Sequence, residues 1–128
     1  MIVDSSAIVA IVFKESGYEE LLSRMENAPI AAAGVPTLAE TGIVLSARLE
    51  ELADGLLERL IDELEIQEIP FGEFHWRESV EAYRRFGKGR HPASLNFGDC
   101  MTYAVANLTG EPLLFVGSDF SKTDVLVA

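Results

Sequence analysis

Four acidic side chains occupy positions from which carboxylates act in catalysis, although they lie far apart along the chain. Asp4 ends a short apolar run at the N-terminus, and Asp119 closely follows the last long apolar run. Glu40 and Asp99 lie in the early turns of two segments with helical periodicity. If the four side chains meet, they form a set of hard oxygen donors without His or Cys, which favours Mg²⁺ or Mn²⁺ over zinc.

Three of these acids also fit simpler structural roles. Asp4 could cap the helix that follows it, because a short side-chain oxygen accepts from the free N–H groups of a first helical turn. Asp99 follows a candidate cap, Asn96, and an acid in a first turn interacts favourably with the helix dipole. Asp119 could be an ordinary turn residue. The sequence leaves both interpretations of these three residues open.

Glu40 is the acid that a structural role explains least. Counting helical turns, it shares a stripe with Pro36, Ile43, Val44 and Ala47, so we expect its side chain to point inward. A lone carboxylate there is costly unless it is paired or bound to a cation. Carboxylates gathered at one place would repel by about 4 kcal/mol per close pair at an effective dielectric of about 20. We therefore favour a site at which a divalent ion neutralises them.

The elements predicted around these acids are short apolar strands separated by helices. The predicted strands span residues 2–3, 30–33, 66–69 and 112–116, with a weak last strand at 125–127. The predicted helices span residues 7–13, 18–27, 37–52, 56–64, 73–86 and 96–108, and Asp54 is expected to cap the fourth of them.

This alternation predicts a three-layer α/β/α domain with four or five parallel strands. Ligands of such sheets bind beyond the carboxyl ends of the strands. Asp4 and Asp119 follow strands, whereas Glu40 and Asp99 open helices that begin at the same edge. The topology therefore predicts that the four acids converge on one rim of the sheet.

Length and composition limit the class of protein. A chain of 128 residues with 48% hydrophobic residues can form one domain with its own core, and we expect a single domain over residues 1–128. The single cysteine, Cys100, excludes an intramolecular disulfide. The N-terminal apolar run lacks a basic region and contains Asp4, so it predicts neither a secretion signal nor a membrane span. We expect a cytoplasmic protein with no membrane partner.

Charge is unevenly distributed. The net charge of −11 argues against a protein that holds nucleic acid by bulk electrostatics. Half of the ten basic residues nevertheless lie in one basic strip, which consists of Arg77, Arg84, Arg85, Lys88 and Arg90. A local basic surface on an acidic molecule is therefore expected.

With these motifs in place, the sequence resembles the PIN-domain ribonucleases, and within them the VapC-type toxins of type II toxin–antitoxin systems. The resemblance covers the whole chain. It rests on four blocks in order: Ile-Val-Asp-Ser-Ser at 2–6, Pro-Thr-Leu-Ala-Glu at 36–40, Leu-Asn-Phe-Gly-Asp-Cys at 95–100 and Leu-Leu-Phe-Val-Gly-Ser-Asp-Phe at 113–120. The family has a PIN-like α/β/α fold, in agreement with the prediction from topology.

The resemblance implies a metal-dependent endoribonuclease that uses Mg²⁺ or Mn²⁺ and the four acids as its catalytic residues. Asp4 and Asp99 would be the metal ligands, and Glu40 and Asp119 would complete the shell or hold water. Ser118 matches a supporting hydroxyl position. Asp124 would be an outer-shell helper, although an exposed turn acid is its simpler interpretation.

The resemblance also suggests roles for the basic strip and for nearby aromatic residues. The basic strip would bind the RNA backbone, and a solvated helix face is an equally good interpretation. The aromatic side chains of Phe74, Trp76 and Tyr83 are predicted to be core rather than a base-stacking platform, as is Cys100. His75 and His91 have no partner suggested by spacing and receive no catalytic role.

The resemblance also implies partners. It predicts a homodimer that a cognate antitoxin inhibits by covering the acidic site, in a heterotetramer or a larger assembly. A nuclease of RNA processing outside any toxin pair and a catalytically silent PIN-like binding module remain alternatives. An Asp-nucleophile phosphatase is disfavoured by Ser6 at the position of its second Asp, and a phosphate-receiving domain by the absence of an acid pair near Lys122.

Overall fold

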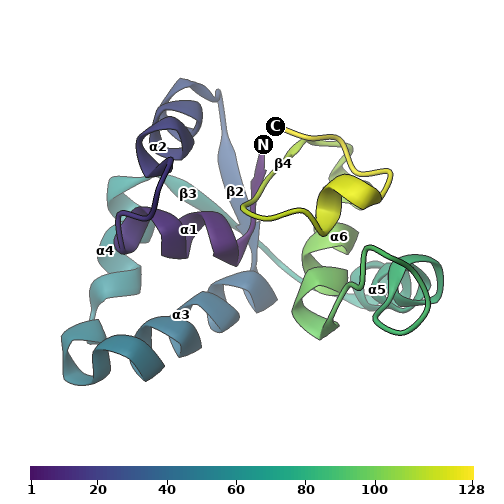
Figure 1. The fold of residues 1–128 in the computed structure, drawn as a ribbon. Coiled ribbons are helices and arrows are strands. Elements are labelled where there is room, and N and C mark those ends of the chain that lie inside the picture. The colour runs from purple at the N-terminus through teal and green to yellow at the C-terminus, as the bar shows by residue number, and fades with distance from the viewer.

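A computed structural model describes all 128 residues and contains a four-stranded parallel sheet (Figure 1). The strands lie in the order β3-β2-β1-β4, with Ile2 in register with Ala32 on one side and Leu113 on the other. Their bounds are Ile2–Val3 for β1, Ala31–Gly34 for β2, Ile66–Ile69 for β3 and Leu113–Leu114 for β4. The predicted three-layer α/β/α fold with parallel strands is confirmed.

Six helices flank the sheet and follow the predicted order. They are α1 (Ser5–Val12), α2 (Tyr18–Asn27), α3 (Val35–Leu49), α4 (Leu56–Glu63), α5 (Glu73–Phe86) and α6 (Phe97–Thr109). Two short 3₁₀ helices, η1 (Glu50–Ala53) and η2 (Phe120–Lys122), complete the secondary structure. No helix is long and apolar enough to cross a lipid bilayer.

Two predicted helix ends differ from the structure for reasons of backbone geometry. The third helix ends at Leu49 rather than at residue 52, because Glu50 adopts a φ of +51° and the chain continues as the 3₁₀ turn η1. Asp54 does not cap α4. Gly55 occupies that position with a φ of +70°, a conformation that glycine adopts without steric cost.

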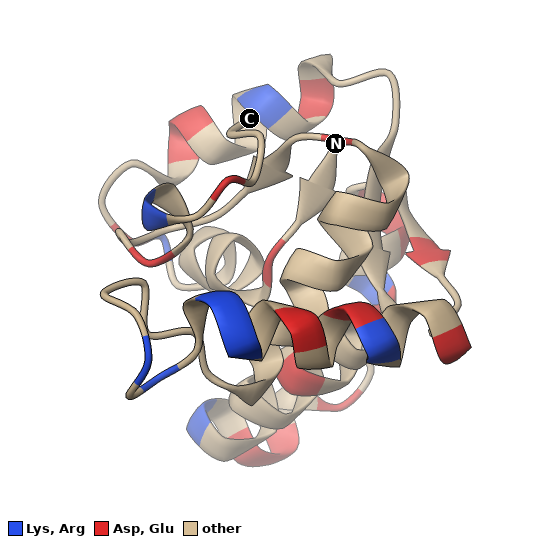
Figure 2. Cartoon of the chain, turned by 90° about the vertical axis from the view of Figure 1, so that its right-hand side faces the viewer, with Lys and Arg blue, Asp and Glu red and all other residues tan.

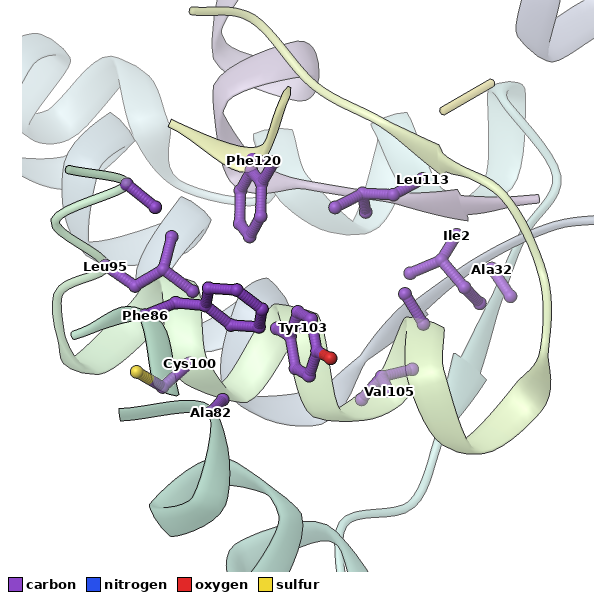
Figure 3. Close-up of a cluster of buried hydrophobic side chains, with 12 residues drawn as sticks. Ile2, Ala32, Ala82, Phe86, Leu95, Cys100, Tyr103, Val105, Leu113 and Phe120 are labelled. Carbon is purple, nitrogen blue, oxygen red and sulfur yellow. The ribbon is translucent and has the colours of Figure 1, made fainter. Parts of the chain in front are cut away.

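Two hydrophobic cores lie on opposite faces of the sheet, because successive side chains of a strand point to opposite faces. Ile2 belongs to the core under α5 and α6, together with Phe86 and the fully buried Tyr103 (Figure 3). The next residue, Val3, belongs to the other core, which contains Ile8 of α1. Strands that are buried on both faces explain the short, unbroken apolar runs.

The last strand is shorter than predicted. Only Leu113 and Leu114 form β4, although residues 112–116 are all apolar. The chain bends from Val116 onwards. The predicted strand at 125–127 is reduced to one parallel bridge between Leu113 and Val127. The early end of β4 releases the chain into a turn that carries Asp119 to the carboxyl edge of the sheet.

Candidate active site at the carboxyl edge of the sheet

Asp4 is buried at the end of β1 and caps α1. Only 5% of its surface is exposed, and its Oδ2 accepts from the Ser6 N–H at 3.1 Å and from Ser6 Oγ at 2.6 Å. Its Oδ1 accepts no hydrogen bond within the chain, and no Lys or Arg pairs with it. The capping role is confirmed, and it leaves one carboxylate oxygen available.

Glu40 reaches from α3 towards the starts of α1 and α6. Ser5 Oγ donates to Glu40 Oε1 at 2.6 Å. On the other side the carboxylate lies against Gly98, where an added Cβ would stand only 1.9 Å from Oε2. The absence of a side chain at position 98 therefore lets Glu40 approach the first turn of α6, directly beside Asp99.

The apolar stripe predicted for α3 is wrong in part. Glu40 is half-buried, but Ile43 is 70% exposed and Ala47 is also exposed. The buried face of α3 instead contains Thr37, Leu38, Thr41 and Leu45. The hydroxyl of the buried Thr41 donates to the Thr37 carbonyl at 2.8 Å. Polar residues therefore occupy part of the buried face of α3.

Asp99 lies in the first turn of α6 in a reciprocal cap with Asn96. The Asp99 N–H donates to Asn96 Oδ1 at 2.9 Å, and the Asn96 N–H donates to Asp99 Oδ2 at 3.0 Å. Burial, and after it the charges of Asp4, Asp119 and Glu40, raise the pKa of the Asp99 carboxyl to about 6, against the opposing effect of the Asn96 N–H. The four predicted acids therefore lie close enough to act on one another.

Asp119 and Ser118 form the exposed part of this site. Asp119 precedes η2, and its side chain makes no capping hydrogen bond. Ser118 accepts at its carbonyl from Ser121 Oγ at 2.6 Å, and its own hydroxyl contacts none of the four acids through a hydrogen bond. The turn is anchored to Asp4 indirectly, because the Val116 N–H donates to Ser6 Oγ at 3.0 Å.

Asp124 accepts hydrogen bonds from α5 and α6 and is not bonded to any of the four acids. The fully buried Tyr103 donates through its hydroxyl to Asp124 Oδ1 at 2.6 Å, and Arg85 Nη2 donates to Oδ2 at 2.9 Å. The Tyr103 hydroxyl and the Arg85 guanidinium lower the pKa of Asp124. Its charge is not among those that raise the pKa of Asp99. Asp124 thus joins the C-terminal segment to α5 and α6, which is a different position from the outer shell predicted for it.

The basic strip divides into paired and unpaired cations. Arg77, Arg84 and Arg85 pair with Glu73, Glu81 and Asp124 at 2.9, 3.5 and 2.9 Å. Lys88 and Arg90, in the loop after α5, have no ion-pair partner. Figure 2 shows the same division, with basic and acidic segments alternating along α5 and only basic ones in the loop that follows it. The loop, rather than the helix, carries uncompensated positive charge.

Three aromatic residues predicted to be core are on the surface. Phe74 is 78% exposed, Trp76 50% and Tyr83 45%. The prediction for Cys100 is confirmed, since the thiol is buried and burial raises its pKa to about 11. His75 and His91 accept backbone hydrogen bonds through Nδ1, from Gly72 and Ala93 respectively.

Sequence reasoning missed two features that hold the acids in place. Ser5 and Ser6 are not among the predicted site residues, but their hydroxyls hydrogen-bond the carboxylates of Glu40 and Asp4. Gly98 was assigned no role, although it admits Glu40. Two adjacent hydroxyls directly after a strand-end acid were the signal for the first feature, whereas nothing local in the sequence indicates the second.

The structure shows no closed set of protein ligands for a metal ion at this edge of the sheet. No three Asp, Glu, His or Cys side chains are gathered tightly enough to enclose an ion by themselves. Mg²⁺ is commonly bound through one or two carboxylates and keeps several waters, so a closed set is not required. Asp4, buried without a cation, and Asp99, whose ionisation is opposed by burial and by three like charges, are the residues that an ion would stabilise most.

Comparison with known proteins relates this geometry to a family. The family model for the PIN domain matches residues 1–126. Ribonuclease VapC36 of Mycobacterium tuberculosis is 45% identical over 128 residues, which cover 98% of this chain and 91% of that protein.

Solved structures show the same fold. The crystal structure of Mycobacterium tuberculosis VapC20, a sarcin–ricin loop cleaving toxin, has a TM-score of 0.80 at 16% identity, covering 99% of this chain and 97% of that one. A chain of a toxin–antitoxin complex from Klebsiella pneumoniae has a TM-score of 0.71 at 18% identity, covering 99% and 95%.

Proposed function

This chain belongs to the PIN domain family, and we propose that it is a metal-dependent endoribonuclease that acts as the toxin of a toxin–antitoxin pair. Family membership and 45% identity to a ribonuclease support the activity. The observation that carries the proposal is the position of the acids at one edge of the sheet, where Asp4 follows β1 and Glu40 lies against Gly98, directly beside Asp99. A divalent ion from solution would neutralise acids with which no Lys or Arg of the chain pairs.

In this proposal Asp4 and Asp99 hold the ion, Mg²⁺ or Mn²⁺. When bound, such an ion would neutralise phosphate charge and lower the pKa of a nearby water molecule. Asp4 offers Oδ1, because Ser6 occupies Oδ2. Asp99 likewise offers Oδ1, since Oδ2 accepts from the Asn96 N–H.

Glu40 and Asp119 flank the place where an attacking water would stand. Ser5 fixes one oxygen of Glu40 and leaves the other free to accept a proton from that water. Asp119 is on an exposed turn and can approach from the solvent side, next to the hydroxyl of Ser118. Attack on phosphorus by this water would cleave the phosphodiester bond and leave the departing sugar oxygen to be protonated.

The partners we propose are those of a toxin. RNA is the substrate, and a cognate antitoxin protein covers the acidic rim. The presence of a similar fold in a toxin–antitoxin complex of Klebsiella pneumoniae supports the antitoxin. We further propose that the toxin is a homodimer that assembles with antitoxin into a heterotetramer or a larger complex.

Metal removal tests the activity directly. Purified protein incubated with transfer RNA should produce discrete fragments when Mg²⁺ or Mn²⁺ is present and none after treatment with a chelator. Restoring the metal should restore cleavage. Intact RNA in the presence of both metals would overturn the proposed function, and cleavage that survives chelation would overturn its metal dependence.

A further inference from the structure

A large apolar groove lies between α5 and the beginning of α6, beside the candidate active site. Its volume is about 840 Å³, and its lining includes Trp76, Tyr83, Phe97 and Met101. Asn96 lines the groove, and its backbone N–H donates to Asp99 Oδ2 at 3.0 Å. The groove and the acidic site therefore meet at the start of α6.

The aromatic rings of the groove are accessible. Phe97 is 82% exposed, Trp76 50% and Tyr83 45%. Large contiguous patches of exposed apolar surface are rare on folded proteins and commonly mark binding sites. Flat rings at the mouth of a groove suit a flat apolar ligand.

The charges around the groove favour an anionic ligand. Lys88 is the only charged residue that lines it, although the chain as a whole carries −11. A further cation without an ion-pair partner lies over one of its rings: the guanidinium carbon of Arg90 is 5.3 Å from the centre of the Tyr83 ring. No carboxylate lines the groove.

We propose that this groove is a subsite for unpaired nucleobases next to the phosphodiester bond that is cut. Aromatic rings stack bases of any identity, and neighbouring cations hold the phosphates between them. Bases within an A-form duplex are not free to stack on a protein, so the subsite selects a single-stranded loop or end. This inference rests on the proposed ribonuclease function and adds to it the position at which bases are bound.

Charge also separates this occupant from a second copy of the chain. An isologous contact through the groove would bring the unpaired cations of both copies, Lys88 and Arg90, to one interface. The groove of one copy offers no acid to neutralise them. A single-stranded polyanion that carries rings satisfies both the apolar lining and the cations.

Intrinsic fluorescence gives a direct test, because Trp76 is the only tryptophan of the chain. Rapid mixing of the Mg²⁺-loaded protein with a short single-stranded oligouridine, before cleavage proceeds, should quench the Trp76 emission saturably. An abasic oligonucleotide of the same length and charge should bind more weakly and leave the emission unchanged. Equal quenching by the abasic strand would overturn the proposal.

Two phenylalanines provide matched variants. Phe97→Ala should weaken oligouridine binding about tenfold, in the range found when one stacking ring is removed. Phe74→Ala is the control, because Phe74 is 78% exposed on α5 but does not line the groove, and it should change binding less than about twofold. Equal effects of the two variants would overturn the subsite.

Further outcomes separate this inference from the proposed function. If the wild-type protein cleaves RNA and Phe97→Ala cleaves it as well as Phe74→Ala does, only the subsite falls. If base-dependent quenching occurs but no RNA is cut under any metal, the subsite stands and the nuclease proposal falls. Sedimentation provides a last check: conversion of a dimer to a monomer by Phe97→Ala alone would assign the groove to a second copy and overturn the subsite.

Discussion

Ser6 Oγ donates to Asp4 Oδ2 at 2.6 Å and accepts from the Val116 N–H at 3.0 Å, so one hydroxyl connects the buried carboxylate that follows β1 to the segment that follows β4. Asp4 keeps its orientation through this hydrogen bond and through the Ser6 N–H. Ser6, in the first turn of α1, thus positions the Asp4 carboxylate that is proposed as a metal ligand.

Ser6→Ala tests this positioning. The variant keeps the backbone hydrogen bond to Asp4 but loses the hydroxyl, so we expect about tenfold weaker Mn²⁺ binding, measured by titration calorimetry, and a loss of stability of about 1 kcal/mol. Ser46→Ala is the control, because Ser46 Oγ donates only to the Gly42 carbonyl on the exposed side of α3. Unchanged Mn²⁺ affinity in Ser6→Ala would contradict a positioning role.

Gly98→Ala separates activity from stability. An added Cβ would stand 1.9 Å from Glu40 Oε2, and the mobile end of a long side chain moves more readily than the helix backbone. Alanine also favours a helix by roughly 1 kcal/mol over glycine. We therefore expect RNA cleavage to fall at least about tenfold, by displacement of a positioned group, while the melting temperature stays equal or rises.

Gly72→Ala is the matched control, since an added Cβ at Gly72 meets no atom within 4 Å. Cleavage by this variant should equal that of the wild type. Full activity in Gly98→Ala would show that Glu40 is not needed where the structure places it.

Tyr103→Phe tests the junction between α6 and the C-terminal segment. It removes the hydroxyl that donates to Asp124 at 2.6 Å, and we expect a loss of about 1–2 kcal/mol in the free energy of unfolding at pH 8. Tyr18→Phe, at a half-buried tyrosine whose hydroxyl makes no hydrogen bond within the chain, should cost less than about 0.5 kcal/mol. Denaturant unfolding of both variants measures the difference.

The same pair of variants predicts a pH dependence. Burial, and then the hydrogen bond to Asp124, raise the pKa of Tyr103, so the neutral phenol is favoured in the folded state. This contribution to stability is fully present below about pH 10, the ordinary pKa of tyrosine, and is lost as the pH rises above it. The free energy of unfolding of the wild type should therefore fall more than that of Tyr103→Phe between pH 9 and pH 11. Parallel losses would contradict the prediction.

Two double variants of equal charge test which cations bind RNA. Lys88→Ala with Arg90→Ala removes the cations without ion-pair partners, whereas Arg77→Ala with Arg84→Ala removes cations that pair with glutamates of α5. The first should weaken RNA binding and reduce the slope of log K against log salt by about 1.4, at about 0.7 per phosphate contact of a single strand. Arg77→Ala with Arg84→Ala should change the slope less. Equal slopes for the two double variants would contradict the prediction that unpaired cations bind RNA more strongly than paired ones.

Much of the fold could be predicted because the first three strands end at or next to a residue that breaks a strand: Asp4, Gly34 and Pro70. Glu73 and Phe86 bound α5 as predicted, and Asp4 follows a strand of only two residues, as the apolar run and its capping chemistry indicated. Parallel topology then placed the acids at one edge. This inference needed only the direction of each element, and direction follows from the alternation of strands and helices.

The remaining features depend on packing between distant elements. The face of α3 could not be assigned by apolar periodicity, because Thr37 and Thr41 are buried with their hydroxyls satisfied. Trp76 was predicted to be core because an isolated helix does not reveal whether a neighbour covers its apolar side. The contact of Gly98 with Glu40 joins residues 58 positions apart and leaves no local signal.

A crystal grown with Mn²⁺ would test the central claim most directly, because the anomalous signal of manganese locates the ion without reference to any assumed ligand. The account predicts one strong anomalous peak at the carboxyl edge of the sheet, between the free oxygens of Asp4 and Asp99. A structure with these two carboxylates turned apart and no manganese between them would contradict it.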